Sequence, residues 1–202
     1  DNPYPEEFNR QAISRLAAIH LCPTSHDAQN LRHERVQGSI YVTGNSVLDN
    51  LRKKNLPISY NNKVIITMHR RENHDTLSEW FIQLDRVARA FGEWDFVYYA
   101  HPNPKVQQHL DNLESVHVQK ALPYDDFIME LAACKFLITD SGGLQEESSF
   151  LRKKSIVCRK KTERVAGIGT FSLLCTTPSD LYSCVDEISR NYLLPDEAES
   201  PY

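Results

Sequence analysis

From residue 63 onward, short apolar runs alternate with longer segments whose apolar residues recur at helical spacing. The first run, residues 63–68, is rich in β-branched side chains, which is typical of a strand buried on both faces of a parallel sheet. Residues 76–91 follow with an amphipathic helical pattern. Further strands are expected at 95–100, 116–118, 135–139 and 155–159, and further helices at 105–113, 125–133, 144–150 and 179–192. The alternation predicts an α/β fold, a Rossmann-like doubly wound parallel sheet with flanking helices.

The first sixty residues follow a different order. A proline-rich entry precedes a helical pattern over residues 6–21, and Thr24 or Ser25 can cap a short helix that runs through Leu31. A strand is expected at 39–43 and a helix at 46–54.

Composition and charge give no support for nucleic-acid binding or a membrane span. A formal net charge of -4 gives no support for nucleic-acid binding, which needs a basic surface, and the basic clusters at 152–154 and 159–161 are read as solvated faces. No stretch approaches the ~18 apolar residues of a membrane span, and no signal peptide is expected at residues 1–5. The five cysteines form no C-x-x-C pair, so we expect buried, reduced thiols in a cytoplasmic protein.

Polar, ionisable or glycine-rich residues follow four of the predicted strands. They are residues 69–73, residues 101–104, residues 140–143, and Arg159 with residues 162–164. Ligands of doubly wound sheets bind outside the carboxyl ends of the strands. The convergence of four such loops therefore predicts a ligand site at that edge.

Residues 140–147, Asp-Ser-Gly-Gly-Leu-Gln-Glu-Glu, run from a buried strand through two glycines into a helix. Free backbone N–H groups and the positive helix end favour a phosphate there, and Gly142 and Gly143 let a ligand approach the backbone. Glu147, about two turns into the helix, can accept hydrogen bonds from a ribose diol. Because neither G-x-G-x-x-G nor the Walker pattern is present, the glycine pair alone leaves an ordinary capped helix N-terminus as the alternative.

Residues 69–73, His-Arg-Arg-Glu-Asn, place an imidazole beside two guanidinium groups. Such a histidine can contact an anionic oxygen or move a proton near neutral pH, and arginines suit a pyrophosphate. The alternative is an exposed charged loop, and His101 alone is more often a capping or core residue. A metal site from His69, His74 and His101 has no i,i+4 ligand pair to support it, so we expect no metal.

Together these segments resemble the non-hydrolysing UDP-N-acetylglucosamine 2-epimerases, bacterial enzymes of the GT-B architecture with two Rossmann-like halves. The matching stretches occur in the family's order and are residues 5–7 with Asn9 and Arg10, then 42–45, 69–73, 101–104, 140–147 and 162–164. The resemblance implies the C-terminal half of that architecture. Three parts are expected: 1–60, a remnant of the N-terminal half plus linker; 61–190, a UDP-binding Rossmann-like domain; and 191–202, the start of a return segment to the missing half.

The resemblance also implies roles for individual residues. Two are catalytic: Glu6 lies at the reacting sugar, and His69 is set against the UDP leaving group. The positions that bind UDP match Phe127 at the uracil, Ser141, Gly142 and Gly143 at the diphosphate, Glu147 at the ribose, and Arg164 near the phosphates. Arg70 and His101 match positions near the site where substrate acts as an allosteric activator.

The implied reaction interconverts UDP-GlcNAc and UDP-ManNAc, a step used in polysaccharide biosynthesis. UDP is eliminated anti, which leaves 2-acetamidoglucal, and is then added back. The expected partners are UDP-GlcNAc or UDP, with no cofactor, no nucleic acid and no membrane, and the full-length enzyme is expected to be a homodimer.

Departures from the family pattern leave alternatives open. Residues 165–168 replace a longer loop that usually contains Pro-Glu, and Arg152-Lys153-Lys154 replaces the usual Gly-Lys-Pro turn. A related UDP-diacetamido sugar is therefore an alternative substrate, and a non-catalytic UDP-binding module is an alternative function. Because part of the family's catalytic carboxylate set is absent, we expect the 202-residue chain to be inactive alone.

Overall fold

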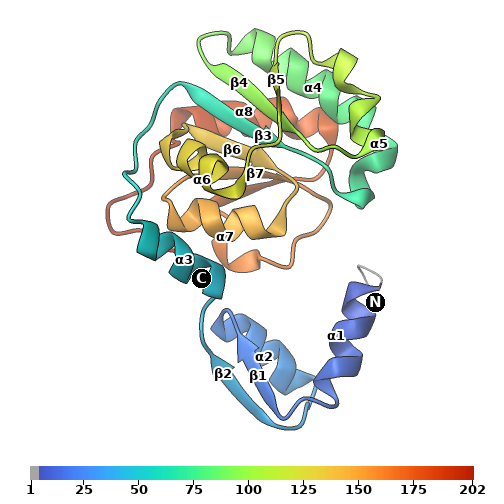
Figure 1. Cartoon of the computed structure of the whole chain (residues 1–202), viewed down its shortest axis with the longest axis vertical. Coiled ribbons are helices and arrows are strands. Elements are labelled where there is room, and N and C mark those ends of the chain that lie inside the picture. The colour runs from blue at the N-terminus through green and yellow to red at the C-terminus, as the bar shows by residue number, and fades with distance from the viewer. Residues whose placement is uncertain (1–4) are drawn as a thin grey trace.

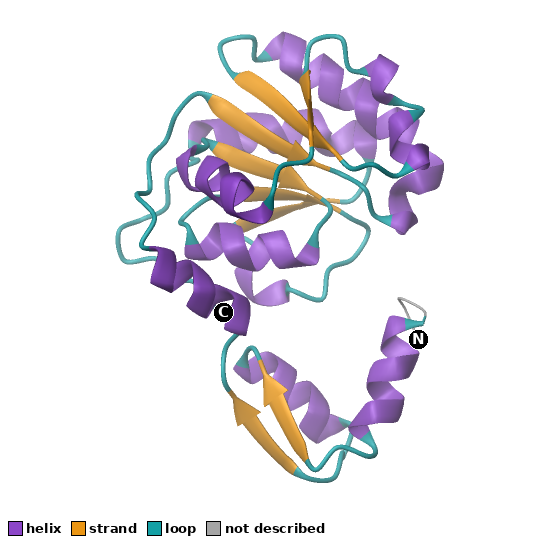
Figure 2. Cartoon of the chain, in the orientation of Figure 1, coloured by secondary structure: helices purple, strands orange, loops and turns teal. Residues whose placement is uncertain are grey.

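The computed structural model describes residues 5–202, which form two units of different size (Figure 1). The larger unit is built on a six-stranded sheet and the smaller on a two-stranded sheet. The two units lie one beyond the other along the long axis of the molecule, with helices around the larger sheet (Figure 2).

The larger sheet is entirely parallel and has the strand order β5-β4-β3-β6-β7-β8. Its strands are β3 (Lys63–Thr67), β4 (Asp95–Ala100), β5 (His117–Lys120), β6 (Phe136–Thr139), β7 (Ser155–Cys158) and β8 (Ser172–Cys175). Numbered within this unit, the order is 3-2-1-4-5-6, the order of a Rossmann fold. The predicted doubly wound parallel sheet is confirmed.

Helices cover both faces of this sheet because alternate residues of each strand point to opposite faces. On one face, Val64 and Ile66 pack with α4 (Leu77–Ala90) and α8 (Leu181–Arg190). On the other face, Ile65 packs in a second core. The helices of that second face are α3 (Ser46–Lys54), α6 (Tyr124–Ala133) and α7 (Gly142–Phe150). Two buried cores therefore hold the sheet between helical layers.

The smaller unit consists of two helices and two paired parallel strands. They are α1 (Glu6–Ser14), β1 (Ile19–Cys22), α2 (Ser25–His33) and β2 (Ser39–Val42). Thr24 caps α2, since its hydroxyl accepts from the Asp27 N–H at 3.3 Å while the Asp27 carboxylate accepts from the Thr24 N–H at 3.1 Å.

Two elements differ from the sequence-based expectation. The predicted helix over residues 6–21 is wrong in its second half, because α1 ends at Ser14 and β1 begins at Ile19. Residues 19–22 alternate between exposed and buried, the period of a strand, and pair in register with residues 39–42. Strand β8 was not expected, because a four-residue run between polar loops gives a weak signal.

Several boundaries also moved. The expected helix over residues 105–113 is a short α5 (Pro104–Gln107) followed by a 3₁₀ turn, Leu110–Asn112. The N–H of His109 bonds to the Val106 carbonyl three residues back, which is the 3₁₀ pattern. Helix α7 begins two residues earlier than expected, at Gly142. Within residues 5–202, no helix combines the length and the apolar character needed to cross a membrane.

Candidate functional site

The candidate site lies where the strand order of the large sheet reverses. Strands β3 and β6 are neighbours there, and the chain leaves them toward opposite sides of the sheet. His69 follows β3 and Asp140 follows β6, so both lie in the crevice at the carboxyl ends of the strands. The Thr67 and Thr139 hydroxyls, 2.7 Å apart, join the last residues of the two strands.

Asp140 organises this junction from a fully buried position. Its Oδ2 atom accepts from the backbone N–H groups of His69 at 2.9 Å and Arg70 at 2.8 Å, and from the Asn73 side chain at 3.1 Å. Asn73 also donates to the Cys158 carbonyl at 3.0 Å, which ties the loop to the end of β7. Burial raises the pKa of the Asp140 carboxyl, and these N–H donors oppose the rise because they stabilise the carboxylate.

His69 is held over this buried carboxylate with its ring partly exposed. Its Nδ1 atom lies 3.9 Å from Asp140 Oδ1, and its ring stacks on His101 with centroids 4.9 Å apart and an interplanar angle of 14°. Burial lowers the pKa of His69, which Asp140 opposes and His101 reinforces. A neutral imidazole offers one N–H donor and one acceptor nitrogen, the form needed to bind an anionic oxygen or pass on a proton. The structure thus brings the predicted residues His69 and His101 together.

The glycine turn begins α7 without a side-chain cap. Ser141 occupies the N-cap position and its hydroxyl makes no capping hydrogen bond, although its N–H donates to the Thr139 hydroxyl at 3.0 Å. A Cβ built on Gly143 would meet nothing within 4 Å, whereas one on Gly142 would lie 2.7 Å from Arg164 Nη1 and 2.9 Å from Glu163 Oε1. Uncapped N–H groups at a helix N-terminus favour an anion.

Glu147 lies on the same helix and is almost fully buried. The Tyr124 hydroxyl donates to its Oε1 atom at 2.8 Å. Burial raises the pKa of Glu147, and the Tyr124 hydrogen bond works against that rise. On α6, Phe127 is half-buried with its ring edge-to-face on Tyr99, centroids 5.6 Å apart. These side chains furnish a carboxylate and an aromatic face beyond the glycine turn.

A run of ion pairs borders the turn and joins loops far apart in the sequence. Arg159, with a side chain only 3% exposed, donates to Glu72 at 2.6 Å and to Glu163 at 2.9 Å. Arg164 pairs with the same Glu163 and donates from Nε to the buried Glu146 at 2.8 Å. Arg159 and residues 162–164 were expected at the site from the sequence, but the link that Glu163 makes between Arg159 and Arg164 was not.

Arg70 and Glu6 occupy less enclosed positions. Arg70 is half-buried. Its pKa is lowered mainly by burial and also by the nearby positive charge of Arg159. Glu6 on α1 is exposed, and its Oε1 accepts from Arg71 Nη2 at 3.1 Å. This bond brings the smaller unit to the loop that carries His69.

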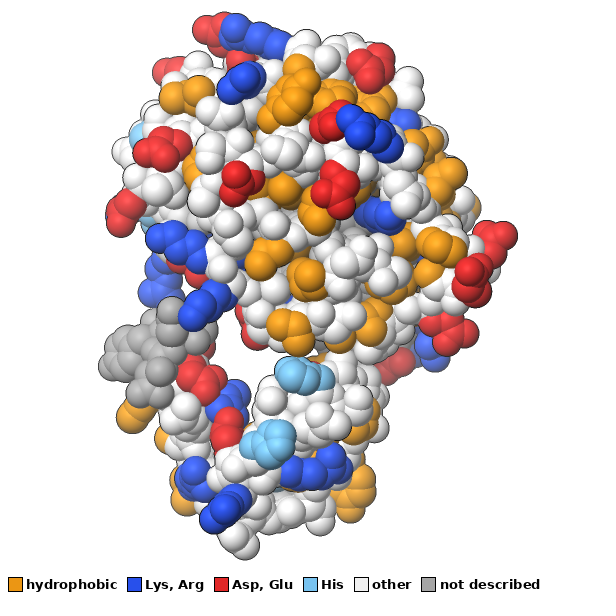
Figure 3. Space-filling model, turned by 180° about the vertical axis from the view of Figure 1, so that it is seen from behind, with side chains coloured by type: hydrophobic (Ala, Val, Ile, Leu, Met, Phe, Trp, Pro, Cys, Tyr) orange, Lys and Arg blue, Asp and Glu red, His pale blue; other side chains and the backbone are white. Residues whose placement is uncertain are grey.

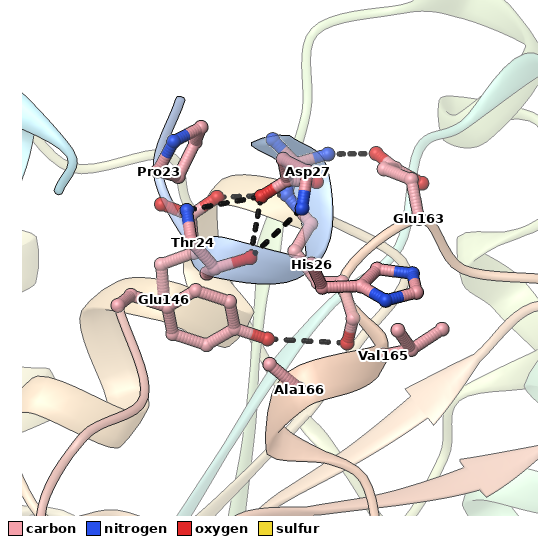
Figure 4. Close-up of a pocket in the computed structure, with 10 residues that line it drawn as sticks. Pro23, Thr24, His26, Asp27, Glu146, Glu163, Val165 and Ala166 are labelled. Atoms are coloured by element: carbon pink, nitrogen blue, oxygen red, sulfur yellow. Dashed lines mark hydrogen bonds and ion pairs between the residues drawn. The ribbon is translucent and has the colours of Figure 1, made fainter. Parts of the chain in front are cut away.

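A cavity of about 150 Å³ lies between the two units. Figure 4 shows His26 and Asp27 of α2 facing Glu163 and Val165 across it. The cavity is also lined by Tyr202, whose hydroxyl accepts from the Gly167 N–H at 3.2 Å and donates to the Arg164 carbonyl at 3.1 Å. The space-filling view from behind shows the surface hollowed between the units (Figure 3). Over residues 5–202, no group of three or more His, Cys, Asp or Glu is placed to hold a metal ion.

Comparison with known proteins identifies the family. The family model described as UDP-N-acetylglucosamine 2-epimerase matches residues 1–202. This chain belongs to the UDP-N-acetylglucosamine 2-epimerase family. The Bacillus subtilis UDP-N-acetylglucosamine 2-epimerase is 32% identical over 100% of this chain and 58% of its own length. The Campylobacter jejuni UDP-N-acetylglucosamine 2-epimerase is 36% identical over 81% of this chain and 50% of its own length.

Solved structures have the same fold as this chain. The S. aureus MnaA–UDP structure superposes with a TM-score of 0.85 at 30% identity, covering 100% of this chain and 60% of that one. The Neisseria meningitidis UDP-GlcNAc 2-epimerase bound to UDP-GlcNAc gives a TM-score of 0.82 at 26% identity, with 99% and 62% covered. This chain therefore has the Rossmann-like C-terminal half of the GT-B architecture and spans about half to three-fifths of the epimerases it matches.

Proposed function

We propose that this chain supplies the UDP-binding side of an active site that interconverts UDP-GlcNAc and UDP-ManNAc. The observation that carries the proposal is the junction at the switch point. There, the buried Asp140 carboxylate accepts from the His69 backbone N–H and so holds the His69 loop in place. The glycine turn at Gly142 and Gly143 begins two residues after Asp140. The His69 imidazole can donate to an anionic oxygen, and the uncapped N-terminus of α7 can bind one. Together they suit a reaction in which a diphosphate leaves.

In the proposed reaction the Glu6 carboxylate, at the reacting sugar, takes the C2 proton as the C1–O bond breaks, and negative charge builds on the departing diphosphate. The Ser141 hydroxyl, the N–H groups of Gly142 and Gly143, and the Arg164 guanidinium stabilise that charge. His69 lies at the leaving group, where its neutral ring donates to an anionic oxygen. A proton delivered to the opposite face of C2, with re-addition of UDP to C1, inverts C2 and completes the epimerisation.

The remaining residues complete a nucleotide-sugar site. We assign Phe127 to the uracil, Glu147 to the ribose and Glu6 to the reacting sugar. Support for Glu147 is its buried carboxylate, which is held by Tyr124 on the same side as the turn. Arg70 and His101 are assigned to the place where a second substrate molecule acts as activator, and His101 there stacks on His69.

The smaller unit is assigned to the N-terminal half of the enzyme. Residues 1–60 form its remnant plus linker, residues 61–190 the UDP-binding domain, and residues 191–202 the return segment. The outward face of β1 exposes Ile19 and Leu21, which further strands and helices of that half would cover. The chain accordingly binds UDP but does not epimerise UDP-GlcNAc alone, and the full enzyme works as a homodimer in the cytoplasm, where its five free cysteines stay reduced.

The test uses a polypeptide in which this chain is joined to a complete N-terminal half. His69→Ala and Glu6→Gln are each expected to lower exchange of the C2 proton with deuterated water by about 10²-fold or more, because each removes a group at the reacting atoms. Glu114→Gln, which also removes a carboxylate paired with an arginine, is the matched control and retains the exchange rate. A wild-type rate in either site variant would remove that residue from the site.

A further inference from the structure

Glu163 occupies the place beside the glycine turn that a ligand phosphate would approach. Its Oε1 atom lies 2.9 Å from the position of a Cβ on Gly142, at the first residue of α7. Its two oxygens contact two different cations, since Oε2 accepts from Arg159 at 2.9 Å and Oε1 pairs with Arg164. A carboxylate bridging two guanidinium groups at an uncapped helix N-terminus resembles a bound anion.

We propose that Glu163 is an internal occupant of the diphosphate subsite and sets the affinity of the site for phosphate. In the unliganded chain it neutralises Arg159 and Arg164. A diphosphate takes over these two cations, and the Glu163 carboxylate turns away from Gly142. This inference rests on the proposed function, because it assigns the diphosphate to this turn.

The neighbouring charges show that the contact can be broken without leaving a buried cation unpaired. Arg159 keeps Glu72 at 2.6 Å, and Arg164 keeps Glu146 at 2.8 Å. The Glu163 side chain is 48% exposed, so it can leave the turn toward solvent, whereas Glu146 is 2% exposed and stays. Removing the Glu163 charge therefore leaves both arginines held and one negative charge fewer at the turn.

The experiment is calorimetric titration of the chain and its Glu163→Gln variant with UDP and with uridine. We expect the variant to bind UDP about tenfold more tightly, since repulsion between the carboxylate and the phosphates is gone, and to bind uridine unchanged. The matched control is Glu130→Gln, which removes a carboxylate paired with Lys63 at the opposite end of β3 and leaves the UDP affinity unchanged.

Equal or weaker UDP binding by Glu163→Gln, with wild-type binding intact, would overturn this inference while the proposed function stands. Absence of UDP binding by the wild-type chain would overturn both. A structure of the UDP complex tests the same point without a substitution. It is expected to show the Glu163 carboxylate away from Gly142, and a carboxylate still beside Gly142 with the diphosphate bound would contradict the inference.

Discussion

Apolar strand residues are mostly buried in the larger unit of this chain and mostly exposed in the smaller one. In the large sheet, Ile65 is fully buried between strand and helix layers. In the small sheet, Ile19 is 62% exposed and Leu21 is 67% exposed, although both belong to a parallel strand. Parallel strands are ordinarily covered on both faces. The large sheet is therefore covered by helices on both faces, whereas Ile19 and Leu21 of the small sheet are left uncovered within residues 5–202.

The residues proposed for the site follow the same division between the two units. Asp140, Glu147 and Arg164 are held by partners within the large unit. Glu6, in the small unit, reaches the site through one exposed ion pair with Arg71. The proposed nucleotide subsite is thus held together within the large unit, whereas the proposed sugar subsite depends on how the smaller unit is positioned.

The largest expected effect separates the two sheets directly. Ile65→Ala is expected to lower the free energy of unfolding by about 2–5 kcal/mol, because it leaves a cavity in a sealed core. Ile19→Ala, the matched change on the exposed face, is expected to stay within about 0.5 kcal/mol. Urea unfolding followed by circular dichroism measures both, and similar losses in the two variants would break the comparison.

The next effect concerns the organisation of the switch point. Asp140→Ala removes the carboxylate that accepts from His69, Arg70 and Asn73. We expect it to lower the free energy of unfolding by about 3 kcal/mol, because these donors are left unpaired. Asp186→Ala removes an exposed carboxylate paired with Arg190 and serves as the control, with a change below about 1 kcal/mol. A near-neutral Asp140→Ala in urea unfolding would show that the junction is not held by this carboxylate.

A smaller, pH-dependent effect tests how the segment between α3 and β3 is anchored. Lys153 is fully buried, donates to the Ser59 carbonyl and lies over the Tyr60 ring, and burial lowers its pKa from 10.5 to about 8. Between these two pH values the unfolded chain binds more protons than the folded chain, so stability from this group rises with pH. The stability of Lys153→Met relative to wild type should therefore fall by about 2 kcal/mol between pH 8 and pH 10.5.

Unfolding curves of the wild-type chain and Lys153→Met at several pH values provide the measurement. Comparing the two proteins cancels the titration of other groups, such as Lys154, whose pKa burial also lowers. A difference that stays constant across this pH range would mean that Lys153 is not a buried cation in the folded chain.

Sequence patterns predicted the large unit well because its core is continuous. Residues 64–66 of the first strand are Val, Ile and Ile, with no polar side chain among them. Burial of this strand on both faces could therefore be inferred from the residues alone. The pattern failed at residues 19–22, since Ile19 also fits the preceding helical spacing. Only the pairing with residues 39–42 shows that this segment is a strand.

The site was predictable in its local motifs and not in its long-range contacts. Position after a buried strand was the signal for His69 and the glycine turn, and Asp140 carries the same signal directly after β6. The Arg159 contact with Glu72 joins residues 87 positions apart, and no local pattern encodes such a pair. Whether the predicted residues carry the assigned roles remains a prediction for the variants described above.

We propose that this chain contains a complete nucleotide subsite and an incomplete sugar subsite. Calorimetric titration of the 202-residue chain with UDP tests it most directly, with folding confirmed by circular dichroism in the same sample. We expect saturable binding of UDP at one site per chain, and we expect this binding to be lost when Glu147 is changed to Gln. Absence of binding heat from the folded wild-type chain, or unchanged binding by Glu147→Gln, would contradict it.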